Sequence, residues 1–594
     1  MSTSNRNLLW ASIIVDELAR SGLRAVCIAP GSRSTPLAVA FAEHNDIQVY
    51  SIIDERSAAF FALGLALASE RPVAVVCSSG TATANFYPAI IEAHYAGVPL
   101  LILTADRPPE LRDSGANQTV DQVKMYGEHV RWAVDVALPE GNPAHLTIRS
   151  LRTLACRAYA TANGMDGTQP KGAVHLNFPF RKPLEPIPAP DDKTSDSAWA
   201  GRSHDQPFTK ILGGRVHPSD SAMEALFDTY AHSARPMIIL GPNRSRALAD
   251  ELTTLAKIGH MPLLADPLSQ ARYTMHWQEM ESEIIGGYDS FLRGAAGWEQ
   301  PDLILRFGAM PTSQALIDYL NASHDAYQIA FSADGTWKDP NHQIDELIIA
   351  DPAEIARSLA QFASEEPRPE SAWSNRFSAA EMRTWEIIDA ALNEDFFDGA
   401  VVADAVSIMP DGASLFIANS LPVRHLDQFA RPAPKAIHVF GSRGASGIDG
   451  TVSTAAGVSQ GVMAPLVLIT GDLGFYHDMN GLLTLKRHGI HIVIVVINND
   501  GGGIFQRLPI AQFDPPYTEL FRTPHGMNFE HVAAQYAIDY AKVDSRAEFR
   551  ADLERALSAV SAHSTLIEVP TDPVQDLQRR SDIVQRVIEA VRTI

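Results

Sequence analysis

The sequence predicts an α/β protein built from three doubly wound, parallel-sheet domains. Short β-branched runs alternate with longer segments rich in alanine and leucine along most of the 594 residues, which is the rhythm of βαβ units. A chain of this length is also too long for a single hydrophobic core. Because two polar stretches that contain proline divide it, we expect domains over residues 1–185, 210–365 and 375–594.

The first block opens with LLWASIIVDELARSG, which is apolar only briefly before Asp16 and Glu17 and therefore favours an amphipathic helix over a signal peptide. Four strands are then expected in AVCIAP, QVYSII, PVAVVCS and PLLILTA. Helical segments such as RSAAFFALGLALASE separate them. A polar linker over residues 180–207 ends the block.

The middle and last blocks repeat this alternation. Expected strands are PMIILGP, DLILRFG and AYQIAFS in the middle block, and SLFIANS, AIHVFGS, PLVLITGD and IVIVVINND in the last. The first and last blocks share a layout: a strand ending in Ser-Gly or Gly-Asp, a helix ending near glycine, and another buried strand. Two similar domains around a third suggest a ligand shared between the similar pair.

Composition and charge exclude several classes of protein. A formal charge of -22 argues against nucleic acid or an anionic membrane as a general partner. The three cysteines, Cys27, Cys77 and Cys156, lack metal-site spacing and fit buried thiols in a reducing compartment. No apolar run is long enough to cross a bilayer, so we expect a cytoplasmic protein without membrane insertion.

Polar side chains follow two neighbouring strands of the last block. Asp472 comes after PLVLITG, and Asn499 ends IVIVVINN, 27 positions later. The segment 475–489 has the length of one crossover helix, so both side chains should reach the same sheet edge, where parallel α/β sheets bind ligands. With the backbone carbonyl of Gly501 they offer three oxygen donors, which suits a hard cation that anchors a diphosphate. A glycine-rich turn capping a core strand is the alternative, but it does not explain a coordinating residue at each strand end.

Arginines are placed at other expected strand ends. Arg33 and Arg107 follow strands of the first block, and Arg424 and Arg443 follow strands of the last. In a chain this acidic, four such arginines indicate recognition of carboxylates, which the guanidinium group binds as a planar fork. Any one of them alone could equally be a surface or ion-paired residue.

The run GDLGFYHDMNGLLTLKRHGIHIVIVVINND resembles the signature of thiamine-diphosphate enzymes, although Leu473 stands where many members have a second glycine. The resemblance implies a thiamine-diphosphate-binding fold, with a pyrimidine-binding domain (1–185), a central domain (210–365) and a diphosphate-binding domain (375–594). It implies thiamine diphosphate and Mg²⁺ or Mn²⁺ as cofactors. The cofactor would lie between the first domain of one subunit and the last domain of another, so that a homodimer is the minimal unit and a homotetramer stays open.

Glu55 is the candidate for activating this cofactor. It follows the strand QVYSII and begins a helical segment, and it resembles the family's activating glutamate. A carboxyl group there shares a proton with the aminopyrimidine nitrogen and favours the imino tautomer, which removes the thiazolium proton. The alternative is a helix N-terminal acid stabilised by the helix dipole.

Four stretches narrow the resemblance: PGSRSTP, TADRPPELRDSGANQT, NSLPVR and SRGASGIDG. They closely resemble the 2-succinyl-5-enolpyruvyl-6-hydroxy-3-cyclohexene-1-carboxylate synthases of menaquinone biosynthesis. The resemblance implies a transferase that decarboxylates 2-oxoglutarate on the cofactor and adds the succinyl unit to isochorismate in a 1,4-addition. These substrates carry several carboxylates, which fits the arginine set.

The resemblance also implies roles for individual residues. The metal ligands would be Asp472, Asn499 and Gly501, and the cofactor would also contact Glu55, Ser420 and Ile448. Catalysis would involve Glu55, Arg33, Arg107, Gln118, Arg424 and Arg443. Substrates would meet Ser32, Arg33, Arg107, Asn117, Gln118, Ser420, Arg424, Arg443, Ile504, Phe505 and Leu508. For the four apolar members, Ile448, Ile504, Phe505 and Leu508, ordinary core packing is an equal alternative.

One departure and two rival functions remain. Some family members carry a basic pair after the RFG strand, where this chain has Ser313 and Gln314, so substrate contacts from the central domain are in doubt. An acetolactate-synthase-like carboligase or decarboxylase would share Glu55 and the metal motif without needing four arginines. A nucleotide-binding protein of Rossmann type would need a glycine fingerprint, and its nearest match, MIILGPNRSR, has Asn243 and Arg246 in place of two glycines.

Overall fold

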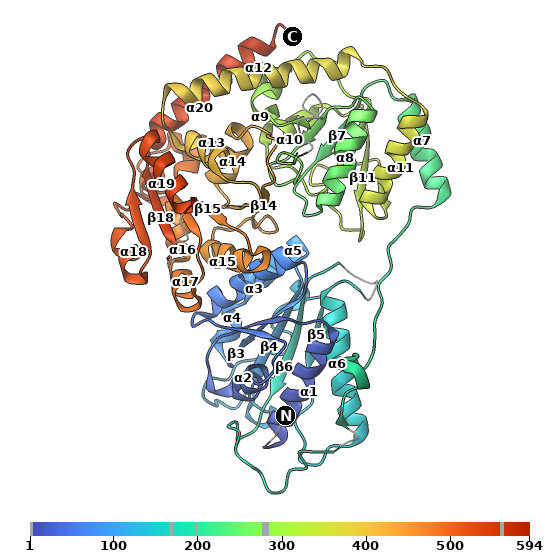
Figure 1. The fold of residues 1–594 in the computed structure, drawn as a ribbon, viewed down its shortest axis with the longest axis vertical. Coiled ribbons are helices and arrows are strands. Elements are labelled where there is room, and N and C mark those ends of the chain that lie inside the picture. The colour runs from blue at the N-terminus through green and yellow to red at the C-terminus, as the bar shows by residue number, and fades with distance from the viewer. Residues whose placement is uncertain (1–3, 166–169, 197–198, 276–283, 559–562) are drawn as a thin grey trace. The chain divides into compact units, whose positions relative to one another are not determined.

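The described residues form three six-stranded sheets, each entirely parallel (Figure 1). This computed structural model describes residues 4–165, 170–196, 199–275, 284–558 and 563–594. The expected α/β class with three parallel-sheet domains is confirmed. None of the helices in the described ranges is both long and apolar enough to cross a membrane.

The described chain separates into two compact units. The first comprises Met1–Gly214, Ser442–Met463 and Tyr476–Ile490, and the second comprises Arg215–Gly441, Ala464–Phe475 and His491–Ile594. These units do not follow the sheets one by one, so the domain boundaries expected from the sequence stay predictions.

The first sheet has the strand order β2-β1-β3-β4-β6-β5. Its strands are β1 (Ala25–Ile28), β2 (Gln48–Ser51), β3 (Val73–Cys77), β4 (Leu100–Asp106), β5 (Trp132–Asp135) and β6 (Ala173–Pro179). The helices among them are α1 (Arg6–Ser21), α2 (Thr35–Ala42), α3 (Glu55–Ser69), α4 (Thr81–Asn85), α5 (Tyr87–Ala96) and α6 (His145–Ala162). One face of this sheet packs on α1 and α6 around the fully buried Trp10 and Phe41.

Local signals explain where the helices of this sheet begin and end. The Asn5 side chain accepts hydrogen bonds from the first backbone amides of α1, and Gly22 closes that helix in the left-handed conformation. Asp54 caps α3 through the amide of Ser57, so Glu55 is the first residue of its helix, as expected.

The second sheet has the order β12-β11-β10-β7-β8-β9. Its strands are β7 (Pro236–Leu240), β8 (Leu263–Ala265), β9 (Ile284–Ile285), β10 (Leu303–Phe307), β11 (Tyr327–Ser332) and β12 (Glu346–Ile349). The associated helices are α7 (Asp220–His232), α8 (Arg246–Ile258), α9 (Tyr288–Phe291), α10 (Gln314–Ala322) and α11 (Pro352–Glu365). This is the order of dinucleotide-binding sheets. The turn after β7 nevertheless lacks their glycine fingerprint, because Asn243 and Arg246 replace two of the glycines. The remaining glycine, Gly241, is required by close packing, since a Cβ there would lie 1.6 Å from the carbonyl oxygen of Ala309.

The third sheet, β14-β13-β15-β16-β18-β17, repeats the order of the first, strand for strand. Its strands are β13 (Ser414–Ile417), β14 (His438–Phe440), β15 (Leu466–Gly471), β16 (Val493–Asn498), β17 (Asp539–Lys542) and β18 (Thr565–Pro570). The helices that follow the second sheet are α12 (Ala372–Glu394), α13 (Asp398–Ile408), α14 (Leu421–Phe429), α15 (Thr451–Val462), α16 (Asp472–His477), α17 (Leu482–His488), α18 (Glu530–Tyr536), α19 (Arg546–Ser558) and α20 (Pro573–Val591). In both outer sheets the strand order reverses beside the first strand, where ligands bind in open α/β sheets.

Two expectations about connecting segments need correction. The segment 475–489 is not one helix: α16 ends at His477, a 3₁₀ turn (Met479–Gly481) follows, and α17 begins at Leu482. The linker expected over residues 180–207 is not free of the first domain, because Phe180, Leu184 and Trp199 are buried in its core.

Candidate functional site

Two of the predicted substrate residues, Arg107 and Gln118, meet Ser79 near the carboxyl ends of β3 and β4. The Arg107 guanidinium, after β4, donates to the hydroxyl of Ser79, which follows β3. That hydroxyl donates to the Gln118 carbonyl at 3.1 Å, and the Gln118 amide donates to the Ser79 carbonyl at 2.8 Å. Ser32 and Asn117 lie exposed on the loops of the same unit. The expected gathering of polar groups at this edge is therefore present in the first unit.

Arg33 is buried beside Arg107. Its NH1 donates to the carbonyl of Phe180 at 2.8 Å, while its buried Nε has no hydrogen-bond partner in the described part of the chain. Burial and then the Arg107 charge lower the pKa of Arg33, and Asp106 opposes them. Two neighbouring guanidinium groups, one of which has an unused hydrogen-bond donor, form a site suited to binding an anion.

Glu55 follows β2 and is half-buried. The segment 477–480 holds the residues around it: Arg56 donates to the His477 carbonyl at 2.5 Å, and Asn480 donates to the Asp54 carboxylate at 3.0 Å. The Glu55 charge also contributes to the raised pKa of Cys77 in β3, whose main cause is burial. The start of α3 is thus fixed from several sides.

The loop that contains Arg443 and Ile448 also belongs to the first unit. Glu92, buried on α5, accepts hydrogen bonds from the amides of Gly444 at 2.7 Å and Ala445 at 2.6 Å. Burial raises the pKa of Glu92, and these amides and the Arg443 charge oppose the rise. The carboxylate therefore fixes the backbone immediately after Arg443.

In the second unit, the predicted metal ligands lie close together. Asp472 follows β15, and its Oδ2 accepts a 2.8 Å hydrogen bond from the amide of Gly501, while its Oδ1 accepts one from Leu473 at 2.7 Å. Asn499 follows β16. Burial raises the pKa of Asp472, and its hydrogen bonds and His525 oppose the rise. The βαβ argument from the sequence therefore places these residues correctly, although the crossover is broken.

The donor set suits a hard cation. The Oδ1 atom of Asn499 is buried and has no hydrogen-bond partner among the described residues. Asp472 adds a carboxylate and Gly501 a backbone carbonyl, and oxygen donors of these kinds are what Mg²⁺ prefers. No cluster of three or more His, Cys, Asp and Glu side chains suited to a metal occurs in the described ranges, so a metal here must rely on amide and carbonyl oxygens beside one carboxylate.

The Ser420 and Arg424 pair lies after β13. Ser420 has a φ of 72°, an uncommon conformation for a residue with a side chain. Its carbonyl accepts a 2.7 Å hydrogen bond from Arg424, so the two residues are held as one piece. Strained backbone of this kind is frequent at ligand sites.

Positive charge accumulates around Arg424. Although Arg507 is exposed, partial desolvation and then the charges of Arg580, Arg293 and Arg424 lower its pKa to about 10, and Asp289 opposes them. This cation, one residue before Leu508, was not among the predicted site residues.

The four apolar candidates are not part of the buried core. Ile448, Ile504 and Phe505 are half-buried, and Leu508 is 48% exposed. The packing alternative weighed from the sequence therefore does not describe them. Their exposure leaves room for contact with a ligand, and their roles stay proposals.

Sequence reasoning missed the residues that support the site. His525 lies 3.2 Å from Asp472, and Arg522 donates to the carbonyl of Asn499 at 2.7 Å. Glu92 and Asp478 are buried carboxylates on other elements. A motif search has no signal for them, because each acts on residues far away in the sequence.

The fold and these strand-end sites define a thiamine pyrophosphate enzyme. Residues 10–125 match the family model described as "Thiamine pyrophosphate enzyme, N-terminal TPP binding domain", and residues 424–569 match "Thiamine pyrophosphate enzyme, C-terminal TPP binding domain". A solved benzoylformate decarboxylase from Polynucleobacter necessarius has a TM-score of 0.68 at 18% identity and covers 96% of this chain and 99% of its own. At that identity the likeness supports the fold alone.

Relatives named as 2-succinyl-5-enolpyruvyl-6-hydroxy-3-cyclohexene-1-carboxylate synthase match nearly the whole chain. The one from Roseiflexus castenholzii is 49% identical over 586 residues, 98% of each chain. That from Haloarcula marismortui is 44% identical over 602 residues, 100% of each chain. The chain belongs to this synthase family and is a thiamine-dependent enzyme of the transferase type.

Proposed function

We propose that the protein decarboxylates 2-oxoglutarate and transfers the remaining succinyl unit to isochorismate by 1,4-addition, in menaquinone biosynthesis. The near full-length identity to synthases of this name carries the proposal. The arginines at the strand ends support it, because the donor keeps one carboxylate after loss of CO₂ and the acceptor has two. An acetolactate-synthase-like reaction on pyruvate would leave these cations without a purpose.

Each part of the site has a proposed task. Asp472, Asn499 and Gly501 hold Mg²⁺, or Mn²⁺ in its place, and through it a diphosphate. The chemistry that thiamine diphosphate supplies when bound is a nucleophilic carbon and an electron sink for loss of CO₂. Glu55 shares a proton with the aminopyrimidine ring, and Ser420 and Ile448 line the cofactor.

The substrates are held by the remaining residues. In the first unit, Arg33 and Arg107 bind carboxylate, and the exposed Ser32, Asn117 and Gln118 add hydrogen bonds. Arg424 and Arg443 orient the 2-oxo acid and its products. Ile504, Phe505 and Leu508 exclude water from the acceptor, whose reactive positions would otherwise meet solvent.

The protein is proposed to act in the cytoplasm as a homo-oligomer. Support comes from the resemblance stated above, in which the first domain of one chain and the last domain of another share a cofactor. A dimer would satisfy this arrangement, and a tetramer would contain two such dimers.

Product analysis by mass spectrometry tests the function. Purified protein is supplied with thiamine diphosphate, Mg²⁺ and 2-oxoglutarate, with and without isochorismate. We expect CO₂ release and an adduct whose mass equals isochorismate plus 2-oxoglutarate minus CO₂. Decarboxylation without an adduct, or turnover with pyruvate alone, would keep the cofactor chemistry and overturn the substrates.

A further inference from the structure

The central domain has no assigned part in this reaction. Ser313 and Gln314, which replace a basic pair of other family members, are used within the domain. The Ser313 hydroxyl donates to Asp289 at 2.6 Å and accepts from the amide of Leu316, at the start of α10, and Gln314 donates to Asp318 at 2.8 Å. These side chains hold local structure, so a contribution of the domain to the site must come from elsewhere.

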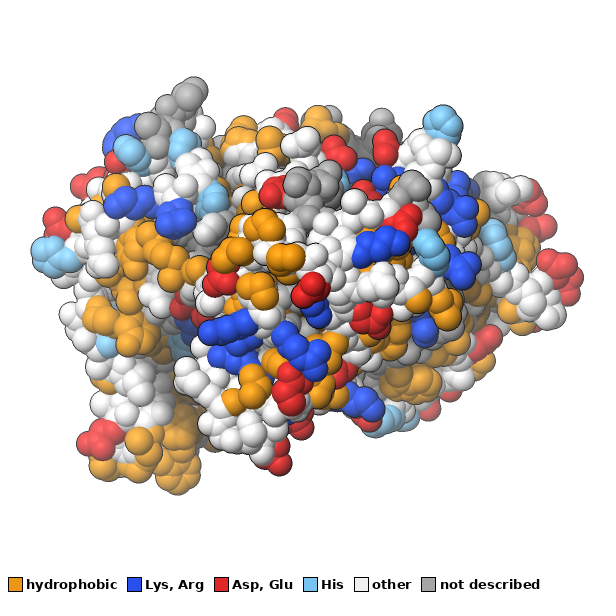
Figure 2. Space-filling model, turned by 90° about the horizontal axis from the view of Figure 1, so that it is seen from below, with side chains coloured by type: hydrophobic (Ala, Val, Ile, Leu, Met, Phe, Trp, Pro, Cys, Tyr) orange, Lys and Arg blue, Asp and Glu red, His pale blue; other side chains and the backbone are white. Residues whose placement is uncertain are grey.

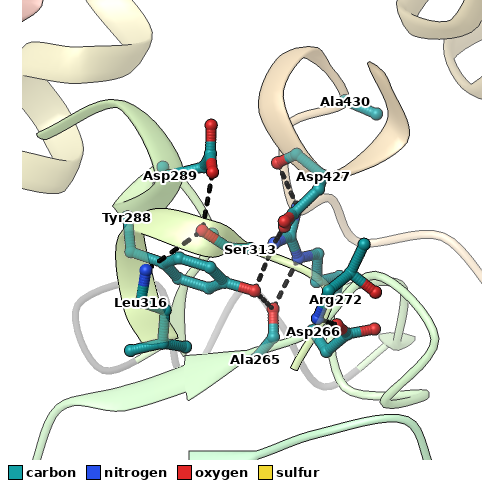
Figure 3. Close-up of polar contacts among 12 residues, drawn as sticks. Ala265, Asp266, Arg272, Tyr288, Asp289, Ser313, Leu316, Asp427 and Ala430 are labelled. Carbon is teal, nitrogen blue, oxygen red and sulfur yellow. Dashed lines mark hydrogen bonds and ion pairs between the residues drawn. The ribbon is translucent and has the colours of Figure 1, made fainter. Parts of the chain in front are cut away.

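Arg272 connects the central domain to α14. Its side chain is fully buried in the second unit and uses all three nitrogens (Figure 3). Nε donates to the Ala265 carbonyl at 2.7 Å, at the end of β8, and NH1 donates to the Asp427 carbonyl at 2.8 Å. NH2 contacts the Asp427 carboxylate at 2.5 Å and the Tyr288 hydroxyl at 3.1 Å. One guanidinium thus binds both the backbone and the side chain of a single helical residue.

Asp427 lies on the same short helix as Arg424. The two are three positions apart on α14, which has only nine residues and begins directly after Ser420. A helix this short moves as one piece, so a fixed Asp427 also fixes the first turn. Ser420, in its uncommon backbone conformation, cannot adjust freely if the helix shifts.

Neighbours of Arg272 add further contacts of the central domain with α14 and β14. The Gln270 side chain donates to the carbonyl of Val439 in β14 at 2.8 Å and accepts from its amide at 3.3 Å. The Tyr273 hydroxyl donates to the Ala430 carbonyl at 3.2 Å, just past the end of α14. Gln270, Arg272 and Tyr273 therefore all bind α14, the residue after it, or β14.

We propose that Arg272 is a positioning residue, by which the central domain fixes α14 and so sets Arg424 and the preceding Ser420 for binding the 2-oxo acid. The inference rests on the proposed function insofar as it names that substrate. The simpler alternative is that the ion pair only joins the two domains.

Energetics separate these alternatives. The free energy of desolvating two buried ions cancels most of the attraction between them. An apolar pair of similar size is therefore often as stable as a buried ion pair. Removal of one partner alone is costly because it leaves a buried charge. Replacing both residues with apolar side chains therefore removes the hydrogen bonds that fix α14, while the space between the central domain and the helix stays filled.

The test variant is Arg272→Met with Asp427→Leu. We expect a melting temperature within a few degrees of the wild type and a KM for 2-oxoglutarate raised about tenfold. Combined with Arg424→Ala, the double replacement should add little to the effect of Arg424→Ala, since both act through one side chain. Fully additive effects, or an unchanged KM in an active enzyme, would overturn the proposal. The single variant Arg272→Lys keeps the charge but not the planar fork. Its KM for 2-oxoglutarate should therefore lie between that of the wild type and that of the double variant.

The matched control is Arg306→Met with Asp339→Leu. This pair is also buried, at 2.8 Å, but lies within the central domain. Asp339 additionally accepts from the amides of Gln343 and Ile344, so the control should be less stable than the test variant. An unchanged KM in the control would show that loss of stability alone does not impair substrate binding.

Hydrogen exchange gives a readout that needs no substrate. The amides of Leu421 and of residues 423–429 should exchange about tenfold faster in the Arg272/Asp427 variant than in the wild type and the control. Unchanged exchange there would overturn the positioning role whether or not 2-oxoglutarate is the substrate. Failure of the product assay with faster exchange would instead count against the proposed function.

Discussion

At the scale of single residues, Asp478 is a buried carboxylate that joins three segments of the first unit. It accepts hydrogen bonds from the amide of Ser453 at 2.6 Å and from the hydroxyls of Ser453 and Ser57 at 3.1 and 3.3 Å. Burial raises its pKa from 3.8 to about 6, and these bonds and Arg56 oppose the rise. The residue ties the start of α15 to the start of α3, two positions after Glu55.

This raised pKa predicts a pH-dependent cost. Because the folded protein holds the proton more tightly than the unfolded chain, ionised Asp478 opposes folding by roughly 3 kcal/mol above about pH 6, and the cost fades as pH falls towards 3.8. Asp478→Asn removes the charge, while its amide oxygen can accept from Ser453 and its amide nitrogen can donate to the hydroxyls. We expect a higher melting temperature than wild type near neutral pH and convergence of the two proteins in acid.

The measurement is the melting temperature of both proteins across that pH range. Only their difference is interpreted, since other carboxyls with lowered pKa values, such as Asp339, change stability in the opposite direction. A variant that melts below the wild type at every pH would show that the hydrogen bonds need a carboxylate.

The contact between Glu92 and the loop after Arg443 predicts an effect of a single residue on turnover. Glu92→Gln keeps the size of the side chain, but its NH₂ group would face one of the two amide donors of Gly444 and Ala445. One bond to the Arg443 loop is lost, so we expect kcat to fall about tenfold and exchange at these amides to accelerate. The exposed Glu43→Gln is the control, and wild-type exchange in the Glu92 variant would contradict the role.

At the scale of elements, α3 and α15 pack closely because glycines remove side chains from their contact (Figure 1). A Cβ on Gly64 of α3 would lie 2.0 Å from the Thr454 carbonyl oxygen, and one on Gly457 of α15 would lie 2.1 Å from the Phe61 carbonyl oxygen. Both neighbours are backbone and cannot rotate away.

Gly64→Ala should therefore destabilise the first unit. Alanine favours an isolated helix by about 1 kcal/mol over glycine, but overpacking against backbone costs more, about 1–3 kcal/mol. We expect the melting temperature to fall by a few degrees and cofactor-dependent activity to fall with it, because α3 begins at Glu55. Gly214→Ala, whose Cβ would meet nothing within 4 Å, is the control. An equally stable Gly64 variant would refute the close packing.

Sequence patterns predicted most of the inner strands and the edge strands β2 and β14, and missed the inner strands β6, β8 and β18 and the edge strands β5, β9, β12 and β17. The runs around β1, β3, β4, β15 and β16 are buried on both faces and therefore continuously apolar. Edge strands β5 (WAVD) and β17 (DYAK) are short and partly polar, so their letters resemble loops. The crossover after Asp472 was taken as one helix because its length fits, but Asp478 and Gly481 form the bend between α16 and α17.

For the candidate site, strand-end residues could be predicted because topology alone brings them together. Asp472 and Asn499 belong to one βαβ unit, so no tertiary knowledge was needed. Glu92, Arg272 and His525 depend on contacts between distant segments, which a single sequence does not encode in any local pattern. The acidic composition argued against a basic surface for nucleic acid. On the face drawn in Figure 2, acidic and basic side chains of the described residues lie interspersed, without a uniformly basic area.

At the scale of the whole molecule, the outer sheets share one strand order while the middle sheet has another. The shared order gives each outer sheet a ligand edge beside its first strand. Glu55 belongs to one such edge and Asp472 to the other. If two chains share each cofactor, every complete site takes Glu55 from one chain and Asp472 from its partner.

Complementation between inactive variants tests this arrangement. Glu55→Gln and Asp472→Asn should each lower turnover at least a hundredfold, through loss of the proton-sharing carboxyl and of a metal ligand. When the two are co-expressed in equal amounts, half of the dimers are mixed, and each of these has one intact site and one doubly changed site. Activity should return to about a quarter of the wild-type level per subunit. Mixed dimers seen by native mass spectrometry without any return of activity would instead place Glu55 and Asp472 of each site in the same chain.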